Sequence, residues 1–327
     1  MKIAKKEKGI INNKKIYSTK FTNSNNYSIT FYNIGGYIHQ ILIPSLNDQL
    51  TTEDVLLGYK NLNDCQISHG YFNAIIGRIA GRIGNSKFIL NNKKYNLHNN
   101  TFADHLHGGK EGFNKKIWKI ENTEENKETL ECTMTYFSPH LEENYPGNLK
   151  CKTIYSLDNE NQFTILFEAI SDHDTIINLT NHNYWNFHGN KHPGQNIANH
   201  SVLIKADNIC EIDKNYIPTG KIISVSNTKF DLNEFYKISQ KFLDEGGIDH
   251  NYILKNKDTS SVVATIFSNL TGMGVEYFTN QPGIQFYTGN MMDKAMEGKN
   301  NKIYEKNFGL CLEPQNFPDA INNSNFP

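Results

Sequence analysis

The sequence of 327 residues lacks any apolar run close to the about 18 residues that a membrane-spanning helix requires. It also lacks an excess of charge of either sign, because 33 basic residues face 34 acidic ones. Without a net positive field, the chain offers little to hold the phosphate backbone of a nucleic acid. Proline and glycine, with 9 and 23 residues, are too few for a low-complexity segment. We therefore expect a folded protein that binds neither membranes nor nucleic acids.

Paired cysteine motifs are absent as well. No CxxC pair occurs, which argues against a zinc knuckle or a redox motif; the five cysteines are Cys65, Cys132, Cys151, Cys210 and Cys311. Scattered thiols are typical of proteins in a reducing compartment. The lysine-rich start of the chain is not followed by the apolar stretch of a signal peptide. We expect a cytoplasmic protein in which residues 1–15 form either a flexible arm or an edge strand.

Short aromatic and β-branched runs recur along the chain, separated by Asn, Gly and Asp. They lie at residues 27–32, 132–136, 151–157, 162–170, 201–206, 261–267, 274–278 and 284–287. Turn signals come at intervals of roughly 8–15 residues, as in a large sandwich or barrel. No linker or internal repeat divides the chain. The sequence therefore predicts one all-β domain over residues 1–327, a large antiparallel β-sandwich with a few short helices.

Three local patterns add detail. Residues 87–97 are expected to form a hairpin, because their central Asn-Asn pair tolerates the positive φ angles of a two-residue turn. The polar segment 121–128 is expected to be an exposed hairpin loop. A short helix is predicted from Asp231, which has Glu234 three residues later as a capping pair, and from apolar residues at helix-like spacing, namely Leu232, Phe235, Ile238 and Phe242.

Residues suited to binding hydroxyl groups or moving protons gather in five short segments. The first places Arg78 and Arg82 among glycines, which suggests a guanidinium held in a fixed direction; two solvated arginines in a surface turn are the alternative. The second contains His105 and His107. Alternate residues of a strand face opposite sides, so these histidines are not expected to share a metal ion, and one of them is expected to line a polar site.

The other three segments carry an imidazole or a carboxylate. His182 lies in a run of amides and aromatic rings, the mixture that sugars require, although a hydrogen-bonded core histidine would look the same. Asp249 follows a double glycine and, taken alone, indicates an ordinary Asx turn. Glu313 lies in an apolar strand. A carboxylate that points from a strand into a cleft can have a raised pKa and act as a base, whereas one on the solvent face cannot.

Together, and in this order, the segments resemble one family, the aldose 1-epimerases or galactose mutarotases, from about Tyr27 to Pro327. The matching motifs are Gly77 to Gly84, His107-Gly108-Gly109 with Gly112-Phe113, Thr180-Asn181-His182, Ala206-Asp207 with Ile217-Pro218-Thr219-Gly220, Phe230-Asp231, Asp249-His250-Asn251, Pro282 to Asn290, and Leu312-Glu313-Pro314-Gln315 with Pro318-Asp319. The resemblance implies a β-sandwich with an open cleft on one sheet. It implies interconversion of the α and β anomers of a free hexose, such as glucose or galactose, without a metal or an organic cofactor.

The resemblance also implies roles for single residues. Glu313 is the implied general base that takes the proton of the C1 hydroxyl, and His182 the implied general acid that protonates the ring oxygen. The implied sugar-binding residues are Arg82, His107, Asp249 and Gln285, with Trp185 packing near the sugar. Gly81 also belongs to this binding set, but the family usually has Asn there, so we expect one hydrogen bond to the sugar to be missing. Arg78 is expected to be structural.

Three rival functions remain open. A glycoside hydrolase could use Asp249 and Glu313 as its two carboxylates. A non-catalytic sugar-binding protein could share the scaffold. An epimerase of a phosphorylated hexose is disfavoured, because the chain has only two arginines. Family members also continue beyond the point that matches Pro327 into a last strand, and without it the neighbouring strand would keep unpaired backbone groups. We expect a monomer or a weak homodimer with a small aldose as its partner.

Overall fold

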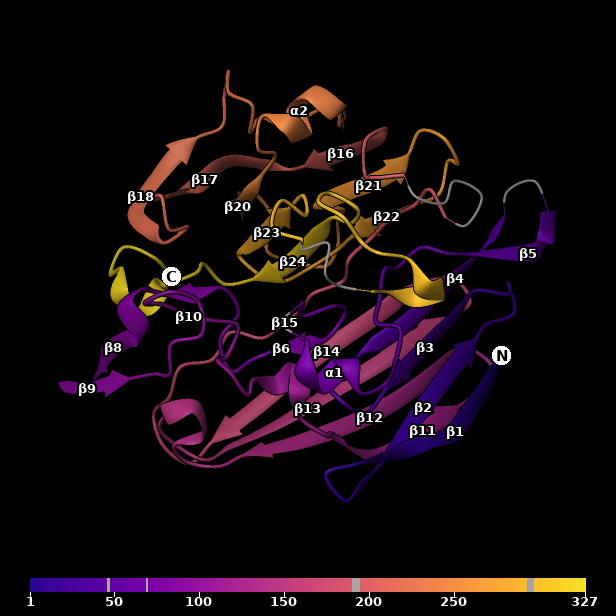
Figure 1. Cartoon of the computed structure of the whole chain (residues 1–327), viewed down its shortest axis with the longest axis horizontal. Coiled ribbons are helices and arrows are strands. Elements are labelled where there is room, and N and C mark those ends of the chain that lie inside the picture. Colours follow the sequence, from indigo (N-terminus) through magenta and orange to yellow (C-terminus); the bar gives the residue numbers. More distant parts are fainter. Residues whose placement is uncertain (46–47, 69, 190–194, 293–296) are drawn as a thin grey trace.

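The computed structural model describes residues 1–45, 48–68, 70–189, 195–292 and 297–327 and consists mainly of antiparallel strands (Figure 1). These residues contain two short α-helices, α1 at Asp64–Ile67 and α2 at Gln240–Asp244. Within the same ranges, no helix is long and apolar enough to cross a membrane. The predicted all-β sandwich is confirmed.

The first half of the chain forms two larger sheets. One has the order β1-β2-β3-β4-β5, with β1 at Lys2–Ile11, β2 at Lys14–Thr22, β3 at Ser28–Tyr32, β4 at Ile38–Ser45 and β5 at Asp48–Asp54. The other has the order β11-β12-β13-β14, with β11 at Lys119–Glu125, β12 at Thr129–Ser138, β13 at Leu149–Asp158 and β14 at Phe163–Ser171. Phe31 of β3 meets Tyr155 of β13 edge to face, with ring centroids 5.0 Å apart, so the two sheets share buried aromatic contacts.

The second half forms two further sheets, in the upper part of Figure 1. One has the order β19-β16-β21-β22, with β16 at His200–Ile204, β19 at Tyr236–Lys237, β21 at Ala264–Ser268 and β22 at Gly274–Tyr277. The other has the order β18-β17-β20-β23-β24, with β17 at Ala206–Ile212, β18 at Pro218–Ser224, β20 at Asp249–Leu254, β23 at Gly283–Tyr287 and β24 at Cys311–Gln315.

Three short ladders complete the fold. They pair β6 at Ile75–Ile76 with β15 at Thr180–Asn181, β7 at Arg82–Ile83 with β10 at His105–Leu106, and β8 at Lys87–Leu90 with β9 at Lys93–Asn96. In Figure 1 the first of these ladders lies below β24, near the centre of the molecule. His182 follows β15 directly, and His107 follows β10, so a histidine comes directly after one strand of each of these two ladders.

In the sheet that contains β20, β23 and β24, alternate side chains point to opposite faces, one apolar and one polar. One set of alternate residues is buried in the main hydrophobic core, namely Tyr252, Leu254, Ile284, Phe286 and Leu312. The other set is polar. In register across the three strands, Asn251 is paired with Gln285, and Gln285 with Glu313. Because side chains opposite one another in a ladder share a face, these three polar side chains lie on the side away from the core.

Most local predictions are confirmed. The predicted runs correspond to strands, with shifted ends, and the 87–97 segment is a hairpin whose turn residues Asn91 and Asn92 have φ angles of 51° and 60°. The N-terminal residues form β1, which lies at the edge of its sheet.

Two local predictions are wrong. The helix does not begin at Asp231, whose carboxylate instead accepts a hydrogen bond from the backbone N–H of Asn233 in an Asx turn. The chain then pairs with β16 through β19, and α2 starts only after Ser239, whose hydroxyl accepts the N–H of Phe242 at 3.1 Å. The segment 121–128 is not a loop throughout, since its first five residues belong to β11. As an edge strand with exposed residues, β11 needs no apolar alternation.

Candidate active site

A cleft of about 470 Å³ opens beside the polar face of β20, β23 and β24. Its lining includes seven of the eight residues predicted to act on or bind the substrate, namely Gly81, Arg82, His107, His182, Asp249, Gln285 and Glu313. These residues are spread over more than two hundred positions of the sequence. The size is within the range of about 300–1,000 Å³ that is usual for small-molecule sites.

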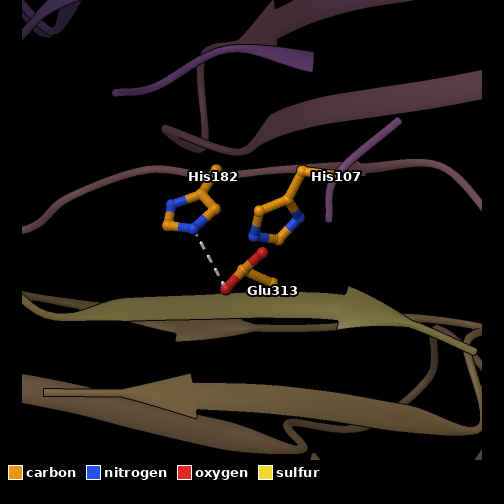
Figure 2. A group of neighbouring side chains, drawn as sticks. All are labelled: His107, His182 and Glu313. Carbon is orange, nitrogen blue, oxygen red and sulfur yellow. Dashed lines mark ion pairs between the residues drawn. The ribbon is translucent and has the colours of Figure 1, made fainter. Parts of the chain in front are cut away.

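Glu313 is a buried residue of this cleft. It lies in the middle of β24 and is 2% exposed, and one of its oxygens, Oε2, has no hydrogen-bond partner within the described residues. The other oxygen, Oε1, lies 3.4 Å from Nε2 of His182 (Figure 2). A carboxylate and an imidazole at this distance can exchange a proton directly or through one intervening group.

His182 faces Glu313 from the opposite wall. Its backbone is fixed on both sides, because its N–H donates to the carbonyl of Ala74 and its carbonyl accepts from the N–H of Asn73. Its ring is stacked between Tyr184, at a centroid distance of 4.9 Å, and Tyr71, at 6.3 Å. The imidazole therefore has little freedom to turn away from the carboxylate.

His107 projects into the cleft from the turn after β10. The turn needs glycine, because Gly108 and Gly109 have φ angles of 86° and 98° and an added Cβ would collide with the carbonyl of Gly77 and the side chain of Glu143. His105 faces the other way: it is buried, and its Nδ1 hydrogen-bonds the carbonyl of His98 at 2.7 Å. As predicted, the two histidines do not share a site.

Gly81 contributes to the site through its backbone. Its N–H donates to Nδ1 of His107 at 3.2 Å, and its carbonyl accepts the N–H of His107 at 3.0 Å. Because Nδ1 accepts a hydrogen bond, the neutral ring carries its proton on Nε2. His107 can therefore donate a hydrogen bond to an oxygen in the cleft.

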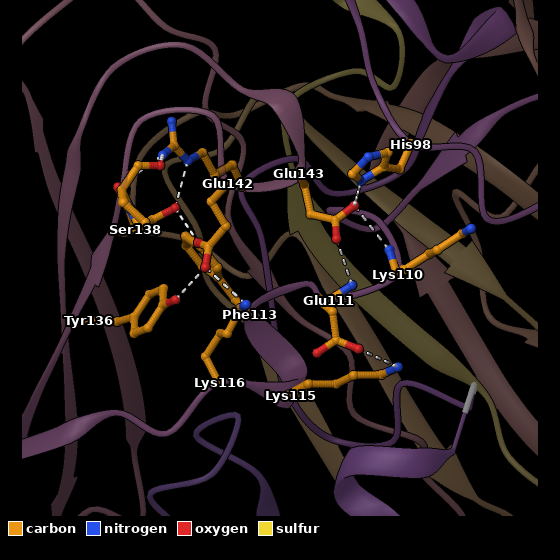
Figure 3. Close-up of polar contacts among 12 residues, drawn as sticks. His98, Lys110, Glu111, Phe113, Lys115, Lys116, Tyr136, Ser138, Glu142 and Glu143 are labelled. Atoms are coloured by element: carbon orange, nitrogen blue, oxygen red, sulfur yellow. Dashed lines mark hydrogen bonds and ion pairs between the residues drawn. The ribbon is translucent and has the colours of Figure 1, made fainter. Parts of the chain in front are cut away.

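The loop behind His107 is braced by two consecutive carboxylates (Figure 3). Glu143 accepts the backbone N–H groups of Lys110 and Glu111 at 3.3 and 3.0 Å and pairs with His98. Glu142 pairs with Lys116 at 2.9 Å. These contacts tie both ends of the segment after His107 to the turn at residues 141–144, which fixes the backbone that presents the imidazole.

Arg82, Asp249 and Gln285 form a polar group beside Glu313. Nε2 of Gln285 donates to Oδ1 of Asp249 at 2.6 Å, and Nη1 of Arg82 lies 4.0 Å from Oδ2 of the same carboxylate. The guanidinium also lies over the ring of Tyr216, 5.2 Å from its centroid. Much of the donor capacity of Arg82 thus remains directed to the cleft.

Burial shapes the proton affinities of these groups. It raises the pKa of Glu313 well above its ordinary value; the charge of Asp249 adds to this effect and that of Arg82 opposes it. Burial lowers the pKa of His182 to about 4. It also lowers the pKa of His107, with His182 and Arg82 acting in the same direction, and raises that of Asp249. Burial thus reverses the usual order of the facing pair, and the pKa of Glu313 lies above that of His182.

The same side chains could in principle bind a metal ion. One ligand atom each of His107, His182 and Glu313 lies within 4.8 Å of the others, and Figure 2 shows the three side chains converging. The hydrogen bond from Gly81 to Nδ1 of His107 argues against this use, because a ring that accepts at Nδ1 holds a proton, not a lone pair, at Nε2. The donor set fits a proton-transfer site better than a metal site.

Two predicted residues lie elsewhere. Trp185 is absent from the cleft lining; it is buried against Phe187, and its indole N–H donates to the hydroxyl of Tyr277 at 2.6 Å. The structure thus does not bring Trp185 to the predicted sugar site. Arg78 is buried and donates to Ser138 and to the carbonyls of Pro139 and Pro146, which is the structural role expected of it.

Sequence reasoning missed the aromatic rings that do line the cleft. Tyr71 and Tyr216 both border it, and both have left-handed backbones, with φ angles of 54° and 64°. No periodic pattern marks such residues, because their orientation depends on turns. Sequence reasoning also missed Asn251 and Gln315 in the lining, although both stand two residues from a predicted site residue on the same strand and hence on the same face.

The chain is similar to known proteins over most of its length. Residues 17–327 match the family model described as aldose 1-epimerase. The chain is 39% identical over 277 residues to the galactose mutarotase of Sus scrofa, which covers 84% of this chain and 78% of that protein. It is 32% identical over 308 residues to the aldose 1-epimerase of Haemophilus influenzae, which covers 92% and 86%. The solved structure of an aldose epimerase homologue from C. elegans has a TM-score of 0.85 at 26% identity and covers 94% of this chain and 92% of that one.

Proposed function

We propose that this chain, which belongs to the aldose 1-epimerase family, interconverts the α and β anomers of a free hexose such as glucose or galactose. The observation that carries the proposal is the facing pair of Glu313 and His182, 3.4 Å apart in a cleft with convergent polar groups. Anomer exchange needs a base at the C1 hydroxyl and an acid at the ring oxygen, and these groups must exchange roles when the ring closes.

The steps follow from the residue chemistry. Glu313 takes the proton of the C1 hydroxyl while His182 gives a proton to the ring oxygen. The bond between C1 and the ring oxygen breaks, and C1 becomes an aldehyde. After rotation about the C1–C2 bond, the ring oxygen attacks the other face of C1. His182 then recovers its proton and Glu313 returns the first one, so no atom or electron is gained or lost.

The pKa shifts favour one protonation state of the pair. Because the pKa of Glu313 is raised well above its ordinary value and that of His182 is lowered to about 4, a single proton rests on the carboxyl and the imidazole is neutral. The reacting state, a carboxylate facing an imidazolium, differs from this one by transfer of that proton from Glu313 to His182. His107, Arg82, Asp249 and Gln285 are the proposed partners of the sugar hydroxyls.

The rival functions either leave a residue of the site without a role or need positive charge that the cleft lacks. A hydrolase built on Asp249 and Glu313 gives His182 no task. Within the described residues, the cleft lining includes no lysine, and Arg82 is the one arginine in it, so a phosphate group would meet little positive charge.

We further propose that the protein is cytoplasmic, a location that the five buried free thiols support. A monomer or a weak homodimer stays a prediction.

Polarimetry tests the proposed function. Freshly dissolved α-D-glucose and α-D-galactose should reach their equilibrium rotation faster with a trace of the protein than in buffer alone. The same preparation should release no nitrophenol from nitrophenyl glycosides and should not act better on glucose 6-phosphate than on glucose. An unchanged rotation rate together with sugar binding by calorimetry would identify a binding protein, and nitrophenol release would identify a hydrolase.

The charges beside Glu313 lead to a prediction about pH. The negative charge of Asp249 raises the pKa of Glu313, and the positive charge of Arg82 lowers it. Asp249→Asn should therefore shift the pH profile of kcat/KM toward lower pH, and Arg82→Met should shift it toward higher pH. Both variants should also lose affinity, but affinity alone does not move the profile in opposite directions. Unmoved profiles in both variants would show that Glu313 does not control the pH dependence.

A further inference from the structure

Two amide side chains of the cleft have no task in the mechanism above. Asn251 lies in β20 and Gln315 in β24. By strand alternation both project to the same side as Asp249 and Glu313, and both line the cleft. They are 2% and 1% exposed, which is comparable with the 2% of Glu313.

Both amides have atoms without a hydrogen-bond partner within the described residues. Nδ2 of Asn251 has none, and neither Nε2 nor Oε1 of Gln315 has one. The only contact of Asn251 of this kind is weak, from the thiol of Cys210 to Oδ1 at 3.9 Å. Buried polar groups are nearly always hydrogen-bonded, so three free amide atoms on residues of one cleft lining point to a ligand or a water within the cleft.

Next to the two amides there is space for a bound molecule, and apolar side chains of the lining cannot replace it as a hydrogen-bond partner. Gly283 lies opposite Gln315 in the ladder, and a Cβ at this position would come within 2.7 Å of Oδ1 of Asn251. The cleft lining also includes Ile212, Pro218 and Pro318, whose side chains can neither donate nor accept a hydrogen bond. Such side chains cannot satisfy the unpaired amide atoms of Asn251 and Gln315.

Strand geometry shows which part of a sugar could meet them. Gln315 is two residues from Glu313 along β24, about 6.6 Å away, and Asn251 is two strands from Glu313, about 9.5 Å away. Glu313 acts at C1 in the proposed function. Because their backbones are displaced from Glu313 along and across the sheet, the amides are placed to meet hydroxyl groups other than that at C1.

We propose that Asn251 and Gln315 together bind one hydroxyl group of the hexose other than that at C1, and that they determine which hexoses are accepted. A hydroxyl donates one hydrogen bond and accepts others, which matches the donors of both amides and the free Oε1 of Gln315. A site built in this way discriminates against a sugar without the hydroxyl, because its buried amides are then left unpaired. This inference rests on the proposed function.

The test combines variants with deoxy sugars. Gln315→Met and Asn251→Leu remove hydrogen bonding at similar volume, and Gln162→Met, at an exposed amide immediately before β14, is the matched control. Each protein is assayed by polarimetry on galactose and on its 2-deoxy, 3-deoxy, 4-deoxy and 6-deoxy forms. Wild type should lose about tenfold or more in kcat/KM on one of these sugars, the usual effect of one hydrogen bond in a buried site.

The decisive comparison is between the loss of kcat/KM that each variant shows on galactose and the loss that it shows on each deoxy sugar. On galactose, Gln315→Met and Asn251→Leu should each lose about tenfold in kcat/KM, but on the critical deoxy sugar they should lose nothing further relative to wild type. Equal losses on all five sugars would overturn the proposal, since they indicate a structural role or a bound water. If one variant does not fold, the other supports or overturns it alone. A wild type inactive on every sugar would instead refute the proposed function.

Discussion

Replacement of Glu313 by Gln is expected to reduce kcat/KM for galactose mutarotation by about 10²–10⁴-fold, the usual contribution of a positioned general base. Gln has the same shape as Glu and keeps a hydrogen-bonding end, but it cannot take a proton from the C1 hydroxyl. The loss should appear mainly in kcat, because the groups proposed to bind the sugar hydroxyls are untouched. The measurement is polarimetry at saturating and at low sugar, with Glu234→Gln, an exposed glutamate, as the matched control.

The same substitution is expected to leave the protein at least as stable as wild type at pH 7. The pKa of Glu313 is raised in the folded state, above the value of the unfolded chain. For such an acid, the native state binds more protons than the unfolded state between the two pKa values, so stability falls as pH rises through this interval. Gln removes this pH-dependent penalty. A melting temperature equal to or above that of wild type, with activity lost, would therefore identify Glu313 as functional. A large drop in melting temperature would instead attribute the lost activity to damaged structure.

The fold was predictable where a short pattern decides the structure. Alternating runs such as 151–157 became strands because alternation buries one face, and the turn at Asn91 and Asn92 needs only residues that tolerate positive φ. The helix predicted from Asp231 failed because an Asx turn and pairing with β16 compete for the same residues. The edge strand β11 was missed because a strand without a buried face carries no alternation.

The sequence motifs indicated which residues form the site, but not how their side chains are oriented. Six residues that the resemblance selected line one cleft, namely Glu313, His182, His107, Arg82, Asp249 and Gln285, although they come from β24, β20, β23 and two short ladders. The resemblance did not reveal that Gly81 orients His107 through two backbone hydrogen bonds. It also selected Trp185 as the aromatic residue near the sugar, whereas Tyr71 and Tyr216 line the cleft. The positions of these residues depend on turns, and contacts between distant parts of the chain determine the conformation of those turns.

Replacement of His182 by Asn is expected to reduce kcat/KM by about 10²–10⁴-fold, because Asn cannot transfer a proton to the ring oxygen. The exposed His173→Asn is the matched control and should retain wild-type activity. The double variant with Glu313→Gln should be little worse than either single variant, since two groups that act as one unit lose their effect together. Fully multiplicative losses would indicate that the two residues act independently.

Chemical rescue separates the proton transfer by His182 from its packing role. In His182→Ala the ring is removed from between Tyr71 and Tyr184, which leaves a space of imidazole shape next to Glu313. Added imidazole should occupy this space and restore part of the activity in a saturable manner, after subtraction of the rate that imidazole causes without protein. It should not restore activity to Glu313→Gln, in which the missing group is the base. Because imidazole in that space would replace both the packing and the proton transfer, N-methylpyrrole, a ring of similar size without a basic nitrogen, serves as the control. Rescue by imidazole alone would assign proton transfer to His182, and equal rescue by both rings would assign it a purely structural role.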